Sequence, residues 1–231
     1  MNISEYFGTI QGEGKYTGTP SLFLRTLGCN LRCAWKNNDG TITKCDTPYT
    51  SWNPEKGKNL SIDDILNIAD ENKLEHIVIT GGEPTLQQDI EDVNKLLSWH
   101  NYKVTVETNG TIYKNLPRAF MSISPKLSNS NALENKLHEK NNNYMSVIEK
   151  YITTNDYQLK FVVNNQEDIN EILKMKNELK VPSDKIYLMP QGISNKQFDE
   201  KNDWIIEQCK KYNFKFSPRL HIMLWGNIRG V

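Results

Sequence analysis

Six short apolar runs that alternate with segments of helical period constrain the fold of this chain more than any other feature. The runs span residues 21–28, 76–82, 103–109, 119–125, 157–163 and 185–192. Segments of helical period span 61–72, 88–100, 165–179 and 195–212. Strands that alternate with helices form βαβ units around a parallel sheet. The pattern predicts an α/β fold, either an open doubly wound sheet or a full or partial barrel.

The length of 231 residues is enough to bury a substantial core as one domain, and no change in composition marks a second one. We therefore expect a single domain over residues 1–231. One segment differs from the rest, because residues about 127–156 are rich in Asn and Lys with few apolar side chains. This composition predicts a surface insertion that carries a short helix.

Charge and hydropathy exclude several classes of protein. Lys and Arg number 28 and Asp and Glu number 28, so nothing in the net charge indicates binding to nucleic acid or to a membrane surface. The first residues lack the basic patch and apolar run of a signal peptide, and no run of about 18 apolar residues occurs. We expect a cytoplasmic protein that acts on a small polar molecule.

Three of the four cysteines, Cys29, Cys33 and Cys45, lie within seventeen residues, directly after the first predicted strand. A second unusual stretch, Gly81-Gly82-Glu83-Pro84, ends the second strand. The carboxyl ends of parallel strands meet at one edge of the sheet, so both stretches are expected at the same rim. In a reducing compartment, clustered thiols are metal ligands or redox groups more often than disulfides.

Two kinds of metal site suit three cysteines. A structural zinc site needs a fourth ligand. The candidates are His76, His100, His138, His221 and Cys209, and none has the local spacing of a zinc finger. Cys209 lies beside Ile205 and Ile206 in the last long helical segment and reads as an ordinary buried thiol. Alternatively, three thiolates suit a [4Fe–4S] cluster with one iron left open for a ligand.

The third cysteine is far from the other two, in the pattern Cys-x3-Cys-x11-Cys. If residues 36–44 are excised, Cys33-Ala-Trp35 continues directly into Cys45-Asp46-Thr47. The excised piece contains Asn38-Asp39-Gly40, a strong hairpin turn signal. Because a hairpin returns the chain to its starting point, we predict a hairpin insertion over 36–44 that leaves the three thiols together.

These residues together resemble a known family. The Cys-x3-Cys pair after the first strand, Trp35, the third cysteine and the Gly-Gly-Glu-Pro stretch are similar to radical S-adenosylmethionine (SAM) enzymes, whose usual pattern is Cys-x3-Cys-x2-Cys. Within that superfamily the chain resembles the 7-carboxy-7-deazaguanine synthases. The stretches that carry this likeness are residues 11–14 (QGEG), 28–31 (GCNL), 45–47 (CDT), 107–110 (ETNG), 124–126 (SPK) and 217–221 (SPRLH).

The resemblance implies a partial (β/α)6 TIM-like barrel and a lyase. The implied reaction converts 6-carboxy-5,6,7,8-tetrahydropterin to 7-carboxy-7-deazaguanine with release of ammonia, in the biosynthesis of queuosine and other 7-deazapurines. It also implies a [4Fe–4S] cluster, SAM, Mg²⁺, an electron donor such as flavodoxin or ferredoxin, and a homodimer. No nucleic acid or membrane partner is expected.

Roles for individual residues follow from the resemblance. Cys29, Cys33 and Cys45 would bind the cluster, and Thr47 would ligate Mg²⁺, with Asp46 as the rival ligand. The residues that would bind SAM are Gly81, Gly82, Glu83, Thr108, Asn109, Ser124, Lys126 and Gln191. Those that would bind the pterin are Gln11, Glu13, Arg25, Thr80, His221 and Val231, with residues 214–231 as a cap over the site. For Glu83 the alternative is a strand-ending turn with a solvated carboxylate.

Two other functions stay open at this point. One is a different radical SAM enzyme, such as an activase that abstracts hydrogen from a glycine of a partner protein. The other is a non-catalytic zinc-binding protein. Zinc would not explain why the Gly-Gly-Glu-Pro stretch shares a rim with the cysteines.

Overall fold

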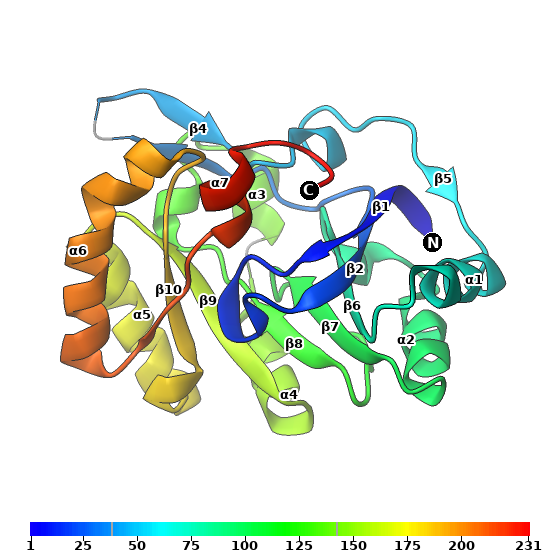
Figure 1. Ribbon diagram of the computed structural model, residues 1–231. Helices are drawn as coiled ribbons and strands as arrows, with labels where there is room; N and C mark the ends of the chain where they lie inside the picture. The colour runs from blue at the N-terminus through cyan, green and yellow to red at the C-terminus, as the bar shows by residue number, and fades with distance from the viewer. Residues whose placement is uncertain (38, 142) are drawn as a thin grey trace.

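A nine-stranded sheet forms the centre of the structure, a computed structural model in which residues 1–37, 39–141 and 143–231 are described (Figure 1). The strands follow the order β11-β10-β9-β8-β7-β6-β2-β1-β5. Their bounds are β1 (Asn2–Ile10), β2 (Pro20–Thr26), β5 (Lys58–Asn59), β6 (His76–Gly81), β7 (Lys103–Thr108), β8 (Phe120–Ile123), β9 (Tyr157–Val163), β10 (Ile186–Pro190) and β11 (Lys215–Phe216). A separate hairpin is made of β3 (Ala34–Lys36) and β4 (Ile42–Lys44).

All six predicted strands are present, as β2, β6, β7, β8, β9 and β10, and each pairs in parallel with the next. The parallel strands and their helices confirm the predicted partial barrel. β1 was not predicted, and it pairs antiparallel with β2 along residues 3–10. Its residues are only half buried and contain no continuous apolar run, so the apolar signal used for the other strands is missing.

The long helices lie along the outer face of the curved sheet (Figure 1). They are α1 (Ile62–Asn72), α2 (Ile90–Trp99), α4 (Met145–Thr154), α5 (Gln166–Leu179) and α6 (Asn195–Tyr212). Shorter helices are α3 (Lys136–Asn141), α7 (Leu220–Trp225), η1 (Gly14–Tyr16), η2 (Pro48–Thr50), η3 (Pro84–Leu86), η4 (Ser128–Ser130) and η5 (Ser183–Lys185). Ser61 and Asp64 cap the N-terminus of α1 as a reciprocal capping box.

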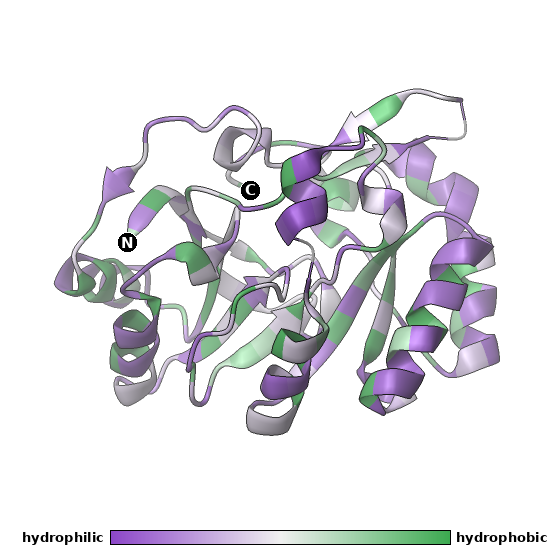
Figure 2. Ribbon diagram, turned by 180° about the vertical axis from the view of Figure 1, so that it is seen from behind, coloured by the Kyte–Doolittle hydropathy of each residue, from purple (hydrophilic) through white to green (hydrophobic). Residues whose placement is uncertain are grey.

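The core lies between the sheet and these helices. It includes fully buried side chains of β2 and β6, namely Leu22, Leu24, Ile77 and Ile79. The outward surfaces of the helices carry repeating hydrophilic residues (Figure 2). Because side chains alternate along a strand, the residues between these apolar ones point to the inner face of the barrel. In β2 these include Arg25.

The segment 127–156 differs from the expected surface insertion. It contains α3 and α4 in addition to the short η4, and α4 connects β8 to β9. Ile148 and Tyr151 of α4 have no exposed surface, and the Tyr151 hydroxyl donates to the carbonyl of Ile112 at 3.0 Å. The Asn-rich residues before α4 concealed its apolar stripe, which is only about three turns long.

The first part of the same segment supports the loop that carries the cysteines. The Trp35 indole donates to Asn129 Oδ1 at 3.1 Å, and the Ala132 amide donates to the Ala34 carbonyl at 3.0 Å. The Asn141 side chain donates to the Asn30 carbonyl at 2.8 Å. These contacts fix residues on both sides of Cys33.

Within the described residues, no helix combines the length and the apolar character that crossing a membrane requires.

Because α4 belongs to the core, we expect Ile148→Ala to lower the free energy of unfolding by about 2–5 kcal/mol, through lost burial and a cavity. Thr153→Ala on the exposed side of the same helix serves as the control and should change it by less than about 0.5 kcal/mol. Urea unfolding followed by circular dichroism measures both. If both substitutions lower the free energy of unfolding by the same small amount, α4 is a surface insertion and does not belong to the core.

Candidate active site at the carboxyl ends of the strands

A cavity of about 840 Å³ opens at the carboxyl ends of the parallel strands. Its walls come from the inner faces of β2 and β6 to β10, the cysteine loop, the N-terminal QGEG segment and the C-terminal tail. The sequence-predicted residues that line it are Gln11, Glu13, Arg25, Cys29, Cys33, Cys45, Thr47, Thr80, Gly81, Gly82, Thr108, Asn109, Ser124, Lys126, Gln191, His221 and Val231. Among the predicted site residues, Glu83 alone is absent from this lining.

The three cysteines enter the cavity from one loop. The predicted hairpin is present as β3 and β4, and at its base the Cys45 amide donates to the Cys33 carbonyl at 3.1 Å. Asn38 of the predicted turn signal lies outside the described residues. The thiols pack with Leu31 and Trp35 in a small apolar cluster of their own. The hairpin therefore leaves Cys33 and Cys45 side by side despite their separation in sequence.

The surroundings of the thiols suit a soft metal–sulfur site. Burial raises the pKa of Cys29 to about 12 and also raises the pKa values of Cys33 and Cys45. The Lys126 ammonium opposes this effect on all three thiols. The Leu31 amide donates to Cys29 Sγ at 3.4 Å, so one thiolate also has a backbone partner. A bound cationic metal group would supply the remaining stabilisation of the thiolate charge.

Of the five candidate fourth ligands for zinc, His221 lines the cavity near Glu13, and the other four lie elsewhere. His76 is at the opposite, amino end of β6, where Ser21 and Thr105 contact its two ring nitrogens at 2.7 Å each. His138 contacts Ser130, His100 follows α2, and Cys209 is buried in the helical core. Among the described residues, no three His, Cys, Asp or Glu side chains form a group able to hold a single metal ion.

Gly81 and Gly82 lie where the end of β6 packs closely against β2 and the cysteine loop. Gly81 has a φ of +130°, and a Cβ there would lie 2.2 Å from the Thr26 carbonyl oxygen. A Cβ on Gly82 would lie 2.0 Å from the Gly28 carbonyl oxygen. These distances are far below contact, so the loop after β6 must lack side chains to lie against the cysteine loop.

Glu83 has neither the exposed carboxylate of the turn alternative nor a surface in the cavity. It is fully buried, and it accepts hydrogen bonds from the Thr85 and Thr108 hydroxyls at 2.7 Å and from the Asn109 amide at 2.7 Å. Burial raises its pKa, while these donors act in the opposite direction. In this structure Glu83 fixes the end of β7 and thereby positions Thr108 and Asn109.

The other residues predicted to bind SAM converge as expected from their strand ends. Asn109 donates to Asn30 Oδ1 at 3.0 Å, which links β7 to the cysteine loop. The Lys126 ammonium donates to the Ser124 hydroxyl at 2.7 Å after β8. Gln191 follows β10 and is held by Lys201 of α6, whose ammonium donates to its side-chain oxygen at 2.7 Å.

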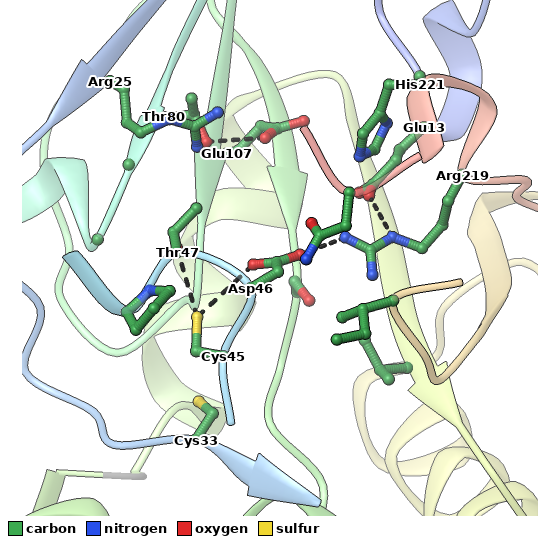
Figure 3. Close-up of a pocket in the computed structure, with 18 of the residues that line it drawn as sticks. Glu13, Arg25, Cys33, Cys45, Asp46, Thr47, Thr80, Glu107, Arg219 and His221 are labelled. Atoms are coloured by element: carbon green, nitrogen blue, oxygen red, sulfur yellow. Dashed lines mark hydrogen bonds and ion pairs between the residues drawn. The ribbon is translucent and has the colours of Figure 1, made fainter. Parts of the chain in front are cut away.

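A buried network of charges extends from Asp46, beside Cys45, to Arg219 and Glu13 (Figure 3). Arg219 donates through Nε to Glu13 at 3.0 Å, pairs through Nη2 with Asp46, and donates through Nη1 to the Gly192 carbonyl at 2.6 Å. Glu13 also pairs with Lys160. Burial alone would raise the pKa of Glu13, but Lys160 and Arg219 together lower it.

Sequence reasoning missed Lys160 and Arg219 as site residues. Arg219 belongs to the SPRLH stretch at residues 217–221, but the sequence assigned it no function in the site. The signal for Lys160 was its position inside the apolar run 157–163. A buried strand tolerates a charge only where it is paired, so this lysine indicated a buried acidic partner.

The residues predicted to bind the pterin line the same half of the cavity. Gln11 and Thr80 both donate to the Glu107 carboxylate, at 3.2 and 2.8 Å. Arg25 donates to Glu5 at 2.7 Å. His221 packs against Gly12, where a Cβ would lie 2.1 Å from its Nδ1, and burial lowers its pKa.

The C-terminal tail closes over this half. Arg229 contacts the Tyr49 ring, with its guanidinium carbon 3.9 Å from the centroid, and pairs with Glu5 at 2.6 Å and Glu55 at 3.0 Å. Val231 lines the cavity beyond this anchor. The Arg229 side chain thus holds the tail at the rim.

Known proteins resemble this chain in sequence and in fold. Residues 23–125 match the Radical SAM superfamily model. A 7-carboxy-7-deazaguanine synthase from Rhodopirellula baltica is 37% identical over 99% of this chain and 88% of its own, and one from Halobacterium salinarum is 34% identical over 98% and 91%. The crystal structure of QueE from Escherichia coli superposes with a TM-score of 0.70 and 25% identity, covering 95% of this chain and 94% of that one.

The charge network generates a prediction about pH. Because the pKa of Glu13 is lower in the folded state, its contribution to stability is complete above the unfolded value of about 4.3 and is lost as the pH falls below it. We expect Glu13→Gln to cost about 3–5 kcal/mol at pH 7, with the difference from wild type shrinking between pH 5 and pH 3. Urea unfolding across this range measures it.

The control for this measurement is Glu178→Gln, an exposed position on α5. It should follow the wild-type pH dependence throughout. A Glu13→Gln deficit of constant size down to pH 3 would contradict the assignment.

The hairpin geometry generates a second prediction. If residues 36–44 are deleted, the bond from the Cys45 amide to the Cys33 carbonyl becomes the i+3 to i bond of an ordinary β-turn. We expect the deletion variant to keep the iron content of wild type after anaerobic reconstitution, whereas Cys45→Ala loses it. Loss of iron from the deletion variant would show that the hairpin is part of the metal site.

Proposed function

The chain belongs to the 7-carboxy-7-deazaguanine synthase family of the radical SAM superfamily, and we propose that the cavity at its strand ends is the active site. The protein is a lyase that carries out the ring contraction of 7-deazapurine biosynthesis with a [4Fe–4S] cluster and SAM. The observation that carries the proposal is the meeting of three thiols and a buried charge network within one cavity.

Cys29, Cys33 and Cys45 hold the cluster in this proposal. Support comes from their position in one loop, their burial and the electrostatic support of Lys126. Three thiolates leave one iron without a protein ligand, which is the coordination site that SAM needs. When bound, the cluster and SAM supply the one-electron chemistry that begins the reaction.

Residues at or just after the ends of β7, β8 and β10 bind SAM. Thr108, Asn109, Ser124, Lys126 and Gln191 offer hydroxyl, amide and ammonium groups to its polar atoms. Gly81 and Gly82 allow the loop after β6 to lie against the cysteine loop, and Glu83 holds the β7 end in place from below. These residues shape the SAM subsite and exclude water from it.

The pterin binds on the opposite side of the cavity. Its aminopyrimidinone ring presents donors and acceptors that match Gln11, Glu13 and Thr80, while Arg25 and His221 provide positive or hydrogen-bonding groups for its carboxylate and carbonyl oxygens. Val231 and the rest of the tail cover it. Buried ion pairs around Glu13 and Arg219 keep these groups at fixed positions before the substrate arrives.

We assign Mg²⁺ to the loop after Cys45. Thr47 lines the cavity with its hydroxyl 3.4 Å from Cys45 Sγ, and Asp46 is paired with Arg219. A ligand beside the cluster loop would bring the ion to the boundary of the two subsites, where it would orient the substrate oxygens. Because Asp46 already has a cationic partner, Thr47 is the better ligand of the two.

The two rival functions fit the cavity less well. An activase must admit the chain of a partner protein, whereas the Arg229 anchor holds the tail across this rim. A zinc-binding protein would leave the charge network around Glu13 without a purpose. A flavodoxin-type or ferredoxin-type electron donor, a homodimer and a cytoplasmic location stay predictions of the sequence.

The decisive test uses anaerobically reconstituted protein with SAM, a reductant and 6-carboxy-5,6,7,8-tetrahydropterin. We expect about four irons per chain and formation of 7-carboxy-7-deazaguanine, both lost in Cys45→Ala. SAM cleavage without turnover of the pterin would favour another radical SAM enzyme. Colourless protein with one zinc would refute the proposal.

The same assay tests the Mg²⁺ ligand. We expect Thr47→Val to raise the Mg²⁺ concentration needed for half-maximal activity by about tenfold or more without lowering the iron content. Asp46→Asn should chiefly lower stability, since it leaves the buried Arg219 short of one partner. The reverse pattern would assign the ion to Asp46.

A further inference from the structure

Lys201 breaks the pattern of the helix that carries it. The buried residues of α6 include Phe198, Lys201 and Ile205, which follow one another at helical spacing on the side that faces the sheet. Only 6% of the surface of Lys201 is exposed. A lysine on a buried stripe costs free energy unless its ammonium is satisfied, so its position needs an explanation.

Both hydrogen bonds that the Lys201 ammonium makes within the described residues go to Gln191. The ammonium donates to the Gln191 backbone carbonyl at 2.8 Å and to the Gln191 side-chain oxygen at 2.7 Å. An ammonium group donates and does not accept, so the oxygen of the Gln191 amide must be the atom that faces it. The pair of bonds therefore fixes which way the amide is turned.

The other end of the same amide has no partner. Gln191 lines the cavity, and only 2% of its surface is exposed. Its Nε2 makes no hydrogen bond within the described part of the chain. A buried donor without an acceptor is costly, and native proteins keep one where a ligand completes it. Lys201 itself does not line the cavity, so any effect it has on a ligand passes through Gln191.

We propose that Lys201 is a positioning residue that turns the Gln191 amide so that its NH₂ group donates to an acceptor atom of bound SAM. This inference rests on the proposed function, which places SAM in the cavity. Rotation of the amide about its last bond would exchange donor for acceptor and repel that atom. Lys201 prevents the rotation because its ammonium binds the oxygen.

The test measures the affinity of reconstituted holoenzyme for SAM by calorimetry in a double-mutant cycle. Gln191→Met removes the donor and keeps the volume, and we expect it to weaken SAM binding about tenfold. Lys201→Met should weaken binding about three- to tenfold in the wild-type background. In the Gln191→Met background it should have no further effect, because its route to the ligand is gone.

Gln191→Glu gives a variant that keeps the partner of Lys201. A carboxylate there still accepts from the ammonium, so the fold should keep its thermal midpoint, but an oxygen replaces the donor and SAM affinity should fall at least tenfold. Lys210→Met, at an exposed position of the same helix, is the matched control and should leave affinity unchanged.

Several outcomes would overturn the inference. Unchanged SAM affinity in a folded Lys201→Met protein, or an equal loss in both backgrounds, would reduce Lys201 to a structural role. Weakened binding of the pterin with normal binding of SAM would overturn the assignment to SAM. Wild-type holoenzyme that binds no SAM would refute the proposed function and this inference together.

Discussion

The three bonds of the Arg219 guanidinium are the interaction on which the rest of this structure depends. They join the segment after β1, the loop that carries the cysteines and the loop after β10, through Glu13, Asp46 and the Gly192 carbonyl. None of these segments is held to the others by the sheet. Burial alone would lower the pKa of Arg219, but Asp46 and Glu13 raise it, so the guanidinium stays charged. A buried guanidinium with three partners at fixed angles defines the shape of the cavity that they enclose.

The two faces of the sheet have different functions: one packs against the helices and the other lines the cavity. Outward side chains such as Leu24 and Ile79 pack against the helices and supply the stability of the core. Their inward neighbours Arg25 and Thr80 line the cavity. Since side chains alternate along a strand, each strand serves both purposes without compromise between them. A charged group such as Lys160 is tolerated at the centre because its partner Glu13 reaches it from another segment.

Contacts around the cavity hold its walls in place. Glu83 binds the end of β7 from below, residues 129–141 brace the cysteine loop, and Arg229 anchors the tail. Each of these contacts fixes backbone that carries a site residue. This arrangement suits a reaction that begins with a highly reactive species, because the site must hold one substrate in place and keep water out.

The sequence by itself determined the alternation of strands and helices, the three-thiol loop with its hairpin, and the rim at which they meet. Those features are local, since apolar runs, turn signals and strand ends are written in neighbouring residues. It failed where the signal was weak or distant: β1 lacks an apolar run, and the Asn-rich residues before α4 hid a core helix. Only the tertiary structure decided that Glu13 meets Lys160 and Arg219, across 147 and 206 residues of chain. A charge in a sequence does not specify its partner, because that choice depends on which strand faces and loops the completed fold brings together.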